Sequence, residues 1–239
     1  MNVTEIMQEF DLLYNNISSG AAPNLNGYEQ SVFLTRAQEE LVRMYYSGSG
    51  QRFMSFESDE ETRRYLDTLV ESSTIALSDP SSYGQFNDYA VPKNNDGRDV
   101  MFVLRETAAN GSEGCANGSV MQVVPVRHED LNRVLENPFK RPNERKALRY
   151  DLSRSGVEFH ILSSVPLSSY TMTYLRKPEP VIVEDLASYG VTIDNKEAVS
   201  AGSVPDMLMH KVIARACELA KAAYTGDLGT SFAVNARDL

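Results

Sequence analysis

The chain contains little cysteine, no tryptophan and no long apolar run. Its 239 residues include two cysteines, Cys115 and Cys217, which form neither a CxxC nor a CxxH spacing. This excludes a disulfide-stapled scaffold and gives no sign of a zinc site. No apolar run approaches the roughly 20 residues that span a bilayer, and the first residues lack the basic and apolar regions of a secretory signal. We therefore expect no membrane segment and a reducing compartment.

Motifs of catalysis are also missing. The sequence has no HExxH, GxSxG, P-loop or Gly-rich dinucleotide motif, and its three histidines lie far apart. Cys217 lies among alanines in an expected helix, which is typical of a small core residue, whereas the reactivity of Cys115 stays open. We expect no catalytic residues, no cofactor and no metal. A soluble enzyme with no recognisable motif is the alternative from a different class.

Charge is unevenly distributed along the chain. The formal net charge is −10, and residues 1–75 hold twelve acids and five bases. Residues 127–154 hold eight bases and five acids. An acidic protein is a poor general nucleic-acid binder, because affinity for phosphates comes from cations. The basic segment is therefore a solvated or partner-facing surface, with direct nucleic-acid contact as the alternative.

Opposite charge in different segments of one chain suits self-association, in which the acidic surface of one subunit meets the basic surface of the next. This hypothesis selects candidate inter-subunit contacts on both sides. They are Arg141, Arg145 and Lys146 in the basic segment, and Glu39 and Glu40 in the acidic N-terminal part.

Helical periodicity marks both ends of the chain. Apolar residues at i, i+3, i+4 and i+7 predict helices over Val3–Ser18, Asn26–Tyr46 and Ser58–Ser72, with capping signals at their starts. A further helix is predicted over Pro205–Tyr224, and it is apolar over most of its circumference. Such a face is buried either by the other helices or by a second subunit. Short loops favour one antiparallel bundle.

The periodicity changes to that of strands after residue 75. The short helix His128–Glu136 interrupts the expected strands, which are Val100–Leu104, Val120–Val126, Val157–Leu162, Tyr170–Leu175 and Val181–Val183. The loop Ala108–Ser119 and the tail Asp227–Leu239 lack an apolar pattern, and we expect both to contact neighbouring chains.

The expected fold class is α+β, mainly a helical bundle of three N-terminal helices and a C-terminal helix, with an inserted small antiparallel β-sheet. The expected domains are residues 1–76 with 203–226 as the bundle, 77–202 as the β-rich insertion, and 227–239 as the tail.

Three groups of segments carry a family resemblance. The first comprises Phe10–Ile17 (FDLLYNNI), Ala22–Leu25 (APNL), Tyr28–Glu29 and Ser31–Glu40 (SVFLTRAQEE). The second is Pro125–Pro142 (PVRHEDLNRVLENPFKRP). The third comprises Tyr174–Leu186 (YLRKPEPVIVEDL), Leu208–Lys211 (LMHK) and Ala216–Ala222 (ACELAKA). Together they resemble the virion structural proteins of crAss-like bacteriophages, in particular those of the head–tail connector.

This resemblance implies a structural virion protein rather than an enzyme. It implies a homo-oligomeric ring of twelve copies in the portal vertex or neck, which extends the DNA exit channel and docks tail components. The implied partners are the portal protein and other neck or tail ring proteins, while packaged DNA passes through without specific binding. The implied location is the virion, assembled in the host bacterial cytoplasm. Another phage tail or neck assembly protein is the alternative within the same class.

Overall fold

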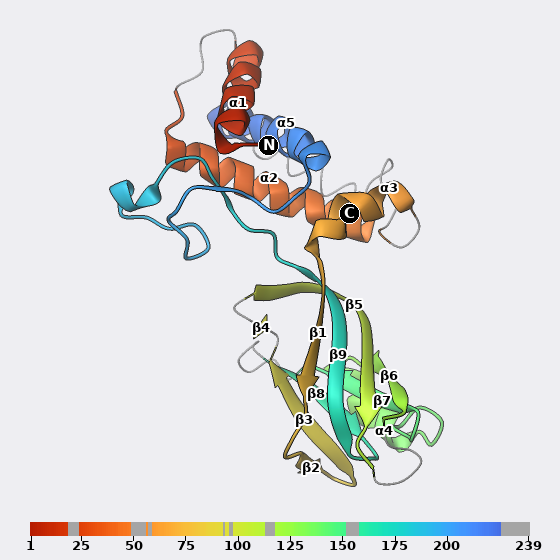
Figure 1. Cartoon of the computed structure of the whole chain (residues 1–239). Helices are drawn as coiled ribbons and strands as arrows, with labels where there is room; N and C mark the ends of the chain where they lie inside the picture. Colours follow the sequence, from red (N-terminus) through yellow and green to blue (C-terminus); the bar gives the residue numbers. More distant parts are fainter. Residues whose placement is uncertain are drawn as a thin grey trace. The chain divides into compact units, whose positions relative to one another are not determined.

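The computed structural model describes residues 1–18, 24–48, 56, 59–92, 94–95, 98–112, 118–151 and 158–225. The chain divides into two compact units. The first, called the helical unit below, comprises Met1–Leu69 and Pro178–Leu239. The second, called the sheet unit, comprises Val70–Lys177, so it is inserted into the sequence of the first (Figure 1). The tail Asp227–Leu239 lies outside the described residues.

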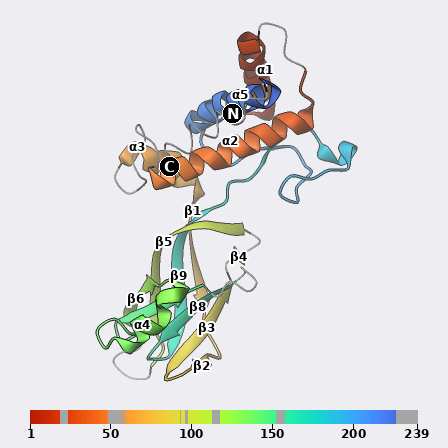
Figure 2. The same cartoon turned by 180° about the vertical axis from the view of Figure 1, so that it is seen from behind.

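Among its described residues the helical unit contains the α-helices α1 (Val3–Ser18), α2 (Gly27–Ser47), α3 (Glu60–Leu66) and α5 (Asp206–Thr225). The predictions of helices at Val3–Ser18, Asn26–Tyr46 and Pro205–Tyr224 are confirmed to within one residue at each end. α5 packs against both α1 and α2 (Figure 2). The broad apolar face of α5 is therefore buried within its own chain, and Val212, Ile213 and Ala216 are fully covered.

Local signals position the ends of α2. The Asn26 side chain accepts a hydrogen bond from the Glu29 N–H at 2.8 Å, and the Glu29 carboxylate accepts one from the Asn26 N–H at 3.0 Å. This reciprocal pair satisfies two backbone donors that the helix itself leaves free. At the other end Gly48 adopts φ +66°, a left-handed conformation that glycine takes without the Cβ penalty of other residues.

The third predicted helix is wrong over its second half. α3 begins after Asp59, whose side chain accepts a hydrogen bond from the Thr62 N–H. The helix ends at Leu66, and a short 3-10 helix, Asp67–Leu69, follows it. The chain then enters strand β1 (Val70–Ala76), which pairs antiparallel with β9 (Leu167–Arg176). Leu69 and Val70 have helical spacing, but the distant partner strand decides their backbone conformation.

The prediction of a mainly helical bundle with a small antiparallel sheet is also wrong, because the described residues of the sheet unit form a large sheet of nine strands. Its strand order is β1-β9-β5-β6-β7-β8-β3-β2, and β4 pairs with β5 outside this path. The remaining strands are β2 (Ser81–Tyr83), β3 (Phe86–Pro92), β4 (Asn94–Asn95), β5 (Arg98–Asn110), β6 (Val120–Pro125), β7 (Lys146–Tyr150) and β8 (Glu158–Ser163).

The sheet is mixed rather than purely antiparallel. β6 and β7 run parallel, and residues 126–145 connect them through a 3-10 helix (His128–Asp130) and α4 (Leu131–Glu136). Parallel neighbours need such a crossover because a tight hairpin reverses the chain direction. The expected strand near Val120–Val126 and the helix near His128–Glu136 are confirmed. The predicted loop Ala108–Ser119 is wrong for Ala108–Asn110, which belong to β5.

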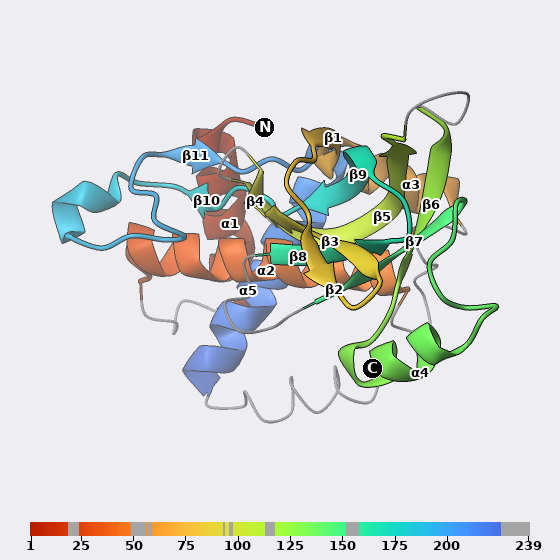
Figure 3. The ribbon, with the colours of Figure 1, turned by 90° about the horizontal axis from the view of Figure 1, so that it is seen from below.

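The sheet unit has two hydrophobic cores, and successive residues of one strand contribute to different cores. Figure 3 shows the curled sheet from below. Ala147 belongs to the larger cluster with Met121, Phe159 and Tyr170. The next residue, Leu148, joins the smaller cluster with Leu131 of the crossover. This alternation is the two-residue period of a strand that is buried on both faces.

In the helical unit, a polar stripe on α2 binds the backbone of residues 179–183. The Ser31 hydroxyl accepts from the Val183 N–H at 3.0 Å, the Thr35 hydroxyl accepts from the Val181 N–H at 3.1 Å, and the Gln38 amide donates to the Glu179 carbonyl oxygen at 2.7 Å. This segment contains β10 (Val181–Ile182), which pairs with β11 (Ser200–Ala201). β11 pairs with one edge of β10, and the buried polar side chains of α2 satisfy backbone groups of this segment that no strand pairs.

Candidate inter-subunit surfaces

Net charge divides along the boundary between the two units. The helical unit holds 20 acidic and 10 basic residues, and the sheet unit holds 13 of each. The whole formal charge of −10 thus belongs to the helical unit. A head-to-tail contact between identical subunits joins two different surfaces, and a difference in charge is one way in which two such surfaces can be complementary.

The basic candidates lie in the crossover between β6 and β7, and residues 127–146 are called the crossover surface below. Arg141 and Arg145 are exposed there, and neither has an ion-pair partner within the described part of the chain. Lys146 differs, because it opens β7 and its ammonium donates to the Lys140 carbonyl oxygen at 2.6 Å. Arg141 and Arg145 are therefore available to a neighbour, whereas Lys146 already serves its own loop.

The acidic candidates are adjacent residues of α2. Glu39 pairs with Arg43 one turn further on, at 3.2 Å. Glu40 accepts two hydrogen bonds from Arg215 of α5, at 2.7 and 3.2 Å, and both side chains are mostly buried. The Arg215–Glu40 pair links two helices of one subunit. A cation from a neighbouring chain would have to share these carboxylates.

A buried polar cluster links strands β5, β7 and β9. The Tyr170 hydroxyl donates to the Glu106 carboxylate at 2.5 Å, and Arg149 lies 3.4 Å from the same carboxylate oxygen. Burial raises the pKa of Glu106 above its ordinary value of 4.5, although the charge of Arg149 opposes this. Burial also raises the pKa of Tyr170. Glu106 and Arg149 line a cavity of about 570 Å³ between β5 and β6.

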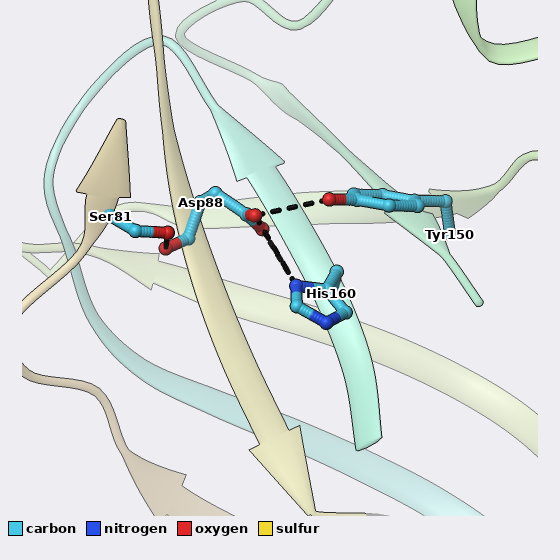
Figure 4. Close-up of polar contacts among 4 residues, drawn as sticks. All are labelled: Ser81, Asp88, Tyr150 and His160. Carbon is cyan, nitrogen blue, oxygen red and sulfur yellow. Dashed lines mark hydrogen bonds and ion pairs between the residues drawn. The ribbon is translucent and has the colours of Figure 1, made fainter. Parts of the chain in front are cut away.

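A second polar cluster joins β3, β7 and β8 (Figure 4). The Asp88 carboxylate accepts a hydrogen bond from the Tyr150 hydroxyl at 3.0 Å and lies 3.2 Å from Nδ1 of His160. Ser81 donates to the main-chain oxygen of Asp88 at 3.2 Å and not to the imidazole, so the cluster lacks the aligned nucleophile of a hydrolase triad. The geometry is that of a cross-link between strands, and burial raises the pKa of Tyr150.

The other chemically interesting residues lie apart. Cys217 is buried on α5, and burial raises the pKa of its thiol to about 12, so it stays protonated at neutral pH. Cys115 lies outside the described residues. Among the residues that the structure describes, no three His, Cys, Asp or Glu side chains converge as metal ligands. Within that same part, none of the helices has the length and apolar character needed to cross a membrane.

Several large apolar side chains of the described residues are exposed, which was not predicted from the sequence, and Phe139 and Met207 are two of them. Phe139, in the crossover, is 91% exposed, and Met207, in the first turn of α5, is 68% exposed. Phe139 follows Asn137-Pro138, a turn signal, and an aromatic residue in a charged turn is the cue that could have identified it. The buried hydroxyls of Ser31 and Thr35 were missed because periodicity assigns no role to polar residues.

Comparisons with known proteins agree with the resemblance seen in the sequence. The family described as phage tail ring protein 3/4 matches residues 1–231. The chain is 34% identical to ring protein 4/5 of Bacteroides phage crAss001 over 248 aligned positions, which cover 99% of each chain. It is 33% identical to ring protein 3 of the same phage over 238 positions, covering 95% of this chain and 99% of the relative. The chain therefore belongs to the phage tail ring protein 3/4 family and is a structural ring protein of a crAss-like phage virion.

Proposed function

We propose that twelve copies of this chain close into a ring in the neck of the virion, below the portal, and that this ring extends the DNA exit channel and docks tail components. The observation that carries the proposal is the separation of charge between the units, with all of the net charge of −10 on the helical unit. Each subunit would then offer its neighbours an acidic unit and a neutral unit that carries the basic crossover.

A ring of identical subunits needs a heterologous interface, in which one patch of each subunit meets a different patch of the next. The crossover surface carries the cations of Arg141 and Arg145, and no acidic side chain among the described residues forms an ion pair with either. The helical unit offers the acidic partner surface, on which Glu39 and Glu40 remain candidate contacts. Complementary patches of this kind favour one register between neighbours and disfavour like-charge pairings.

The partners that we propose are the portal protein and other ring proteins of the neck or tail. This chain is about equally similar to two differently named ring proteins of one phage, at 34% and 33% identity. Such a relationship supports a neck in which rings of related chains contact one another. We also propose that assembly takes place in the host bacterial cytoplasm before the virion is released.

The proposed channel would let DNA pass without holding it. Affinity for DNA rises with the number of phosphates that protein cations neutralise. In a subunit with a net charge of −10 acidic side chains outnumber basic ones, so repulsion between like charges disfavours adhesion of the DNA duplex. DNA is therefore proposed as cargo of the channel and not as a specific ligand.

The test is the mass of the purified protein in solution, alone and mixed with its portal protein. Mass photometry should show a discrete species of twelve times the 26.6 kDa subunit in at least one of the two samples. Negative-stain images of that species should show a closed ring. Monomers in both samples would contradict the proposal, and a ring of another subunit number would correct its stoichiometry.

A further inference from the structure

The crossover presents one aromatic side chain to solvent on an ordered turn. Phe139 is 91% exposed, although an aromatic ring is among the side chains that gain most from burial. The residues that follow it in sequence are Lys140 and Arg141, and Arg145 lies on the same turn segment. An exposed aromatic with cations around it has the composition of a protein-interaction hot spot.

Hydrogen bonds hold this turn in one conformation. Asn137 accepts from three backbone N–H groups: its side-chain oxygen from Phe139 at 3.0 Å, and its main-chain oxygen from Lys140 at 3.0 Å and Arg141 at 2.9 Å. The ammonium of Lys146 then closes the turn on the Lys140 carbonyl oxygen. A turn that is already ordered loses little conformational entropy when its tip is buried against a partner.

The helical unit carries a groove of matching character at the start of α3 and α5. It has a volume of about 380 Å³, and its lining consists of Glu60, Glu61, Arg64, Tyr65, Pro205 and Met207. Met207 supplies exposed apolar surface and Pro205 is half-buried, whereas Tyr65 is only 6% exposed. The carboxylates of Glu60 and Glu61 lie on exposed positions of the same groove.

The ion pair already present in the groove is easily exchanged. Glu60 contacts Arg64 at 2.9 Å, and both side chains are more than three-quarters exposed, at 78% and 79%. Water screens exposed pairs of this kind, so the carboxylate loses little by taking another cation. A neighbour that brings an arginine can therefore pair with Glu60 while an aromatic ring covers Met207.

We propose that the Phe139 turn of one subunit docks into the groove formed by Tyr65, Pro205 and Met207 on the next copy of the chain. This inference rests on the proposed ring and specifies its interface. The Phe139 ring would lie against the Met207 thioether, a favourable contact between sulfur and an aromatic ring, and against Pro205. Arg141 and Arg145 would face Glu60 and Glu61, although the Glu61 carboxylate already accepts a hydrogen bond from the Tyr65 hydroxyl at 2.6 Å. Apolar burial and charge complementarity would then act at the same contact.

Disulfide trapping between two different variants tests this contact. In a Cys115→Ser background, the Phe139→Cys protein is mixed with the Met207→Cys protein and oxidised mildly under assembly conditions. Both substituted side chains are exposed, so folding should be unaffected, and Cys217 is buried and stays unreactive. We expect a covalent dimer of one copy of each variant, and a ladder of higher covalent oligomers when both cysteines are on one chain.

Val120→Cys replaces Phe139→Cys as the matched control, since Val120 is also exposed, at 73%, and also lies in the sheet unit. It should give no dimer with Met207→Cys. As a second measurement, Phe139→Ser should raise the protein concentration needed for half-assembly by about tenfold or more, the loss typical of a hot-spot residue. Rings that form without the Phe139–Met207 cross-link, or with equal Val120 cross-linking, would overturn the contact but leave the ring intact. Wild-type protein that never forms rings would overturn both.

Discussion

The ammonium of Lys146 and the main-chain carbonyl oxygen of Lys140 are joined by a hydrogen bond of 2.6 Å. This bond gives Lys146, a candidate for contacts between subunits, a role inside its own subunit. Replacing Lys146 would disturb the turn and any interface together. Arg141 and Arg145 are free of this complication, because no ion pair within the described residues uses them.

The first prediction concerns this turn. Lys146→Met removes the ammonium but keeps the aliphatic stem, so residues 137–145 should lose order. We expect faster hydrogen exchange at the amides of Lys140 and Arg141, and a fall of about 1 kcal/mol in the free energy of unfolding by urea. Arg145→Met is the control, and it should change the free energy by less than about 0.5 kcal/mol. Unchanged exchange in Lys146→Met would show that the bond does not order the turn.

The second prediction concerns charge between subunits. Arg141→Glu combined with Arg145→Glu should weaken ring assembly while the subunit stays folded, because both side chains are exposed. Exposed pairs contribute only about 0.2–1 kcal/mol each, so a single reversal can be silent, but every interface of a ring carries the change. Mass photometry at low and high salt measures the effect, which salt should diminish. Normal assembly of the double variant at low salt would refute the charge-pair explanation alone.

The third prediction concerns the polar stripe of α2. Ser31→Ala leaves the buried Val183 N–H without its acceptor, which should cost about 1–3 kcal/mol of unfolding free energy. Ser47→Ala on the same helix is the matched control, since the Ser47 hydroxyl donates to the Arg43 carbonyl oxygen at an exposed position. It should be almost neutral. Equal effects of the two substitutions in urea titrations would argue against a supporting role for Ser31.

The fourth prediction concerns pH. Because the pKa of Glu106 is raised by burial, the folded protein binds this proton more tightly than the unfolded chain does. Stability due to the protonated carboxyl is complete below the ordinary pKa of 4.5 and is lost as pH rises through the raised value. Glu106→Gln lacks this titration, so wild type should lose stability relative to the variant as pH rises above 4.5.

Urea unfolding of both proteins from about pH 4 upward measures this difference in the free energy of unfolding. Each tenfold increase in the proton affinity of Glu106 on folding should contribute about 1.4 kcal/mol to it. Glu158→Gln serves as the control, because Glu158 is an exposed residue of β8 in the same unit. A difference between wild type and Glu106→Gln that stays constant with pH would contradict the raised pKa.

The helices could be predicted because their signals are local. The stripe containing Ile6, Phe10 and Tyr14 repeats with the helical period, and Asn26 and Gly48 mark the ends of α2 within a few residues. β1 has no such signal, because Val70–Ala76 is mostly polar and its partner β9 lies about a hundred residues away in sequence. Contacts between distant segments decide a sheet of this size, and one sequence does not reveal them.

The candidate surfaces were predicted only in part for the same reason. The basic composition of residues 127–154 is visible in the sequence, so the crossover could be selected. The difference between Lys146 and Arg145 depends on how the turn folds back onto the Lys140 carbonyl oxygen. The exposure of Phe139 depends likewise on which residues the smaller core admits, and that core includes Leu131 but not Phe139.

The insertion of the sheet unit has a consequence for how such proteins can be altered. Its first residue, Val70, pairs directly with Leu175, two residues before its last, so both ends of the unit lie on neighbouring strands. A segment with adjacent ends can be gained, lost or exchanged as a single genetic cassette, since a short linker from Leu69 to Pro178 would restore the chain path. Chimeras that swap this cassette between ring protein relatives would keep α3 and β10 connected as they are now.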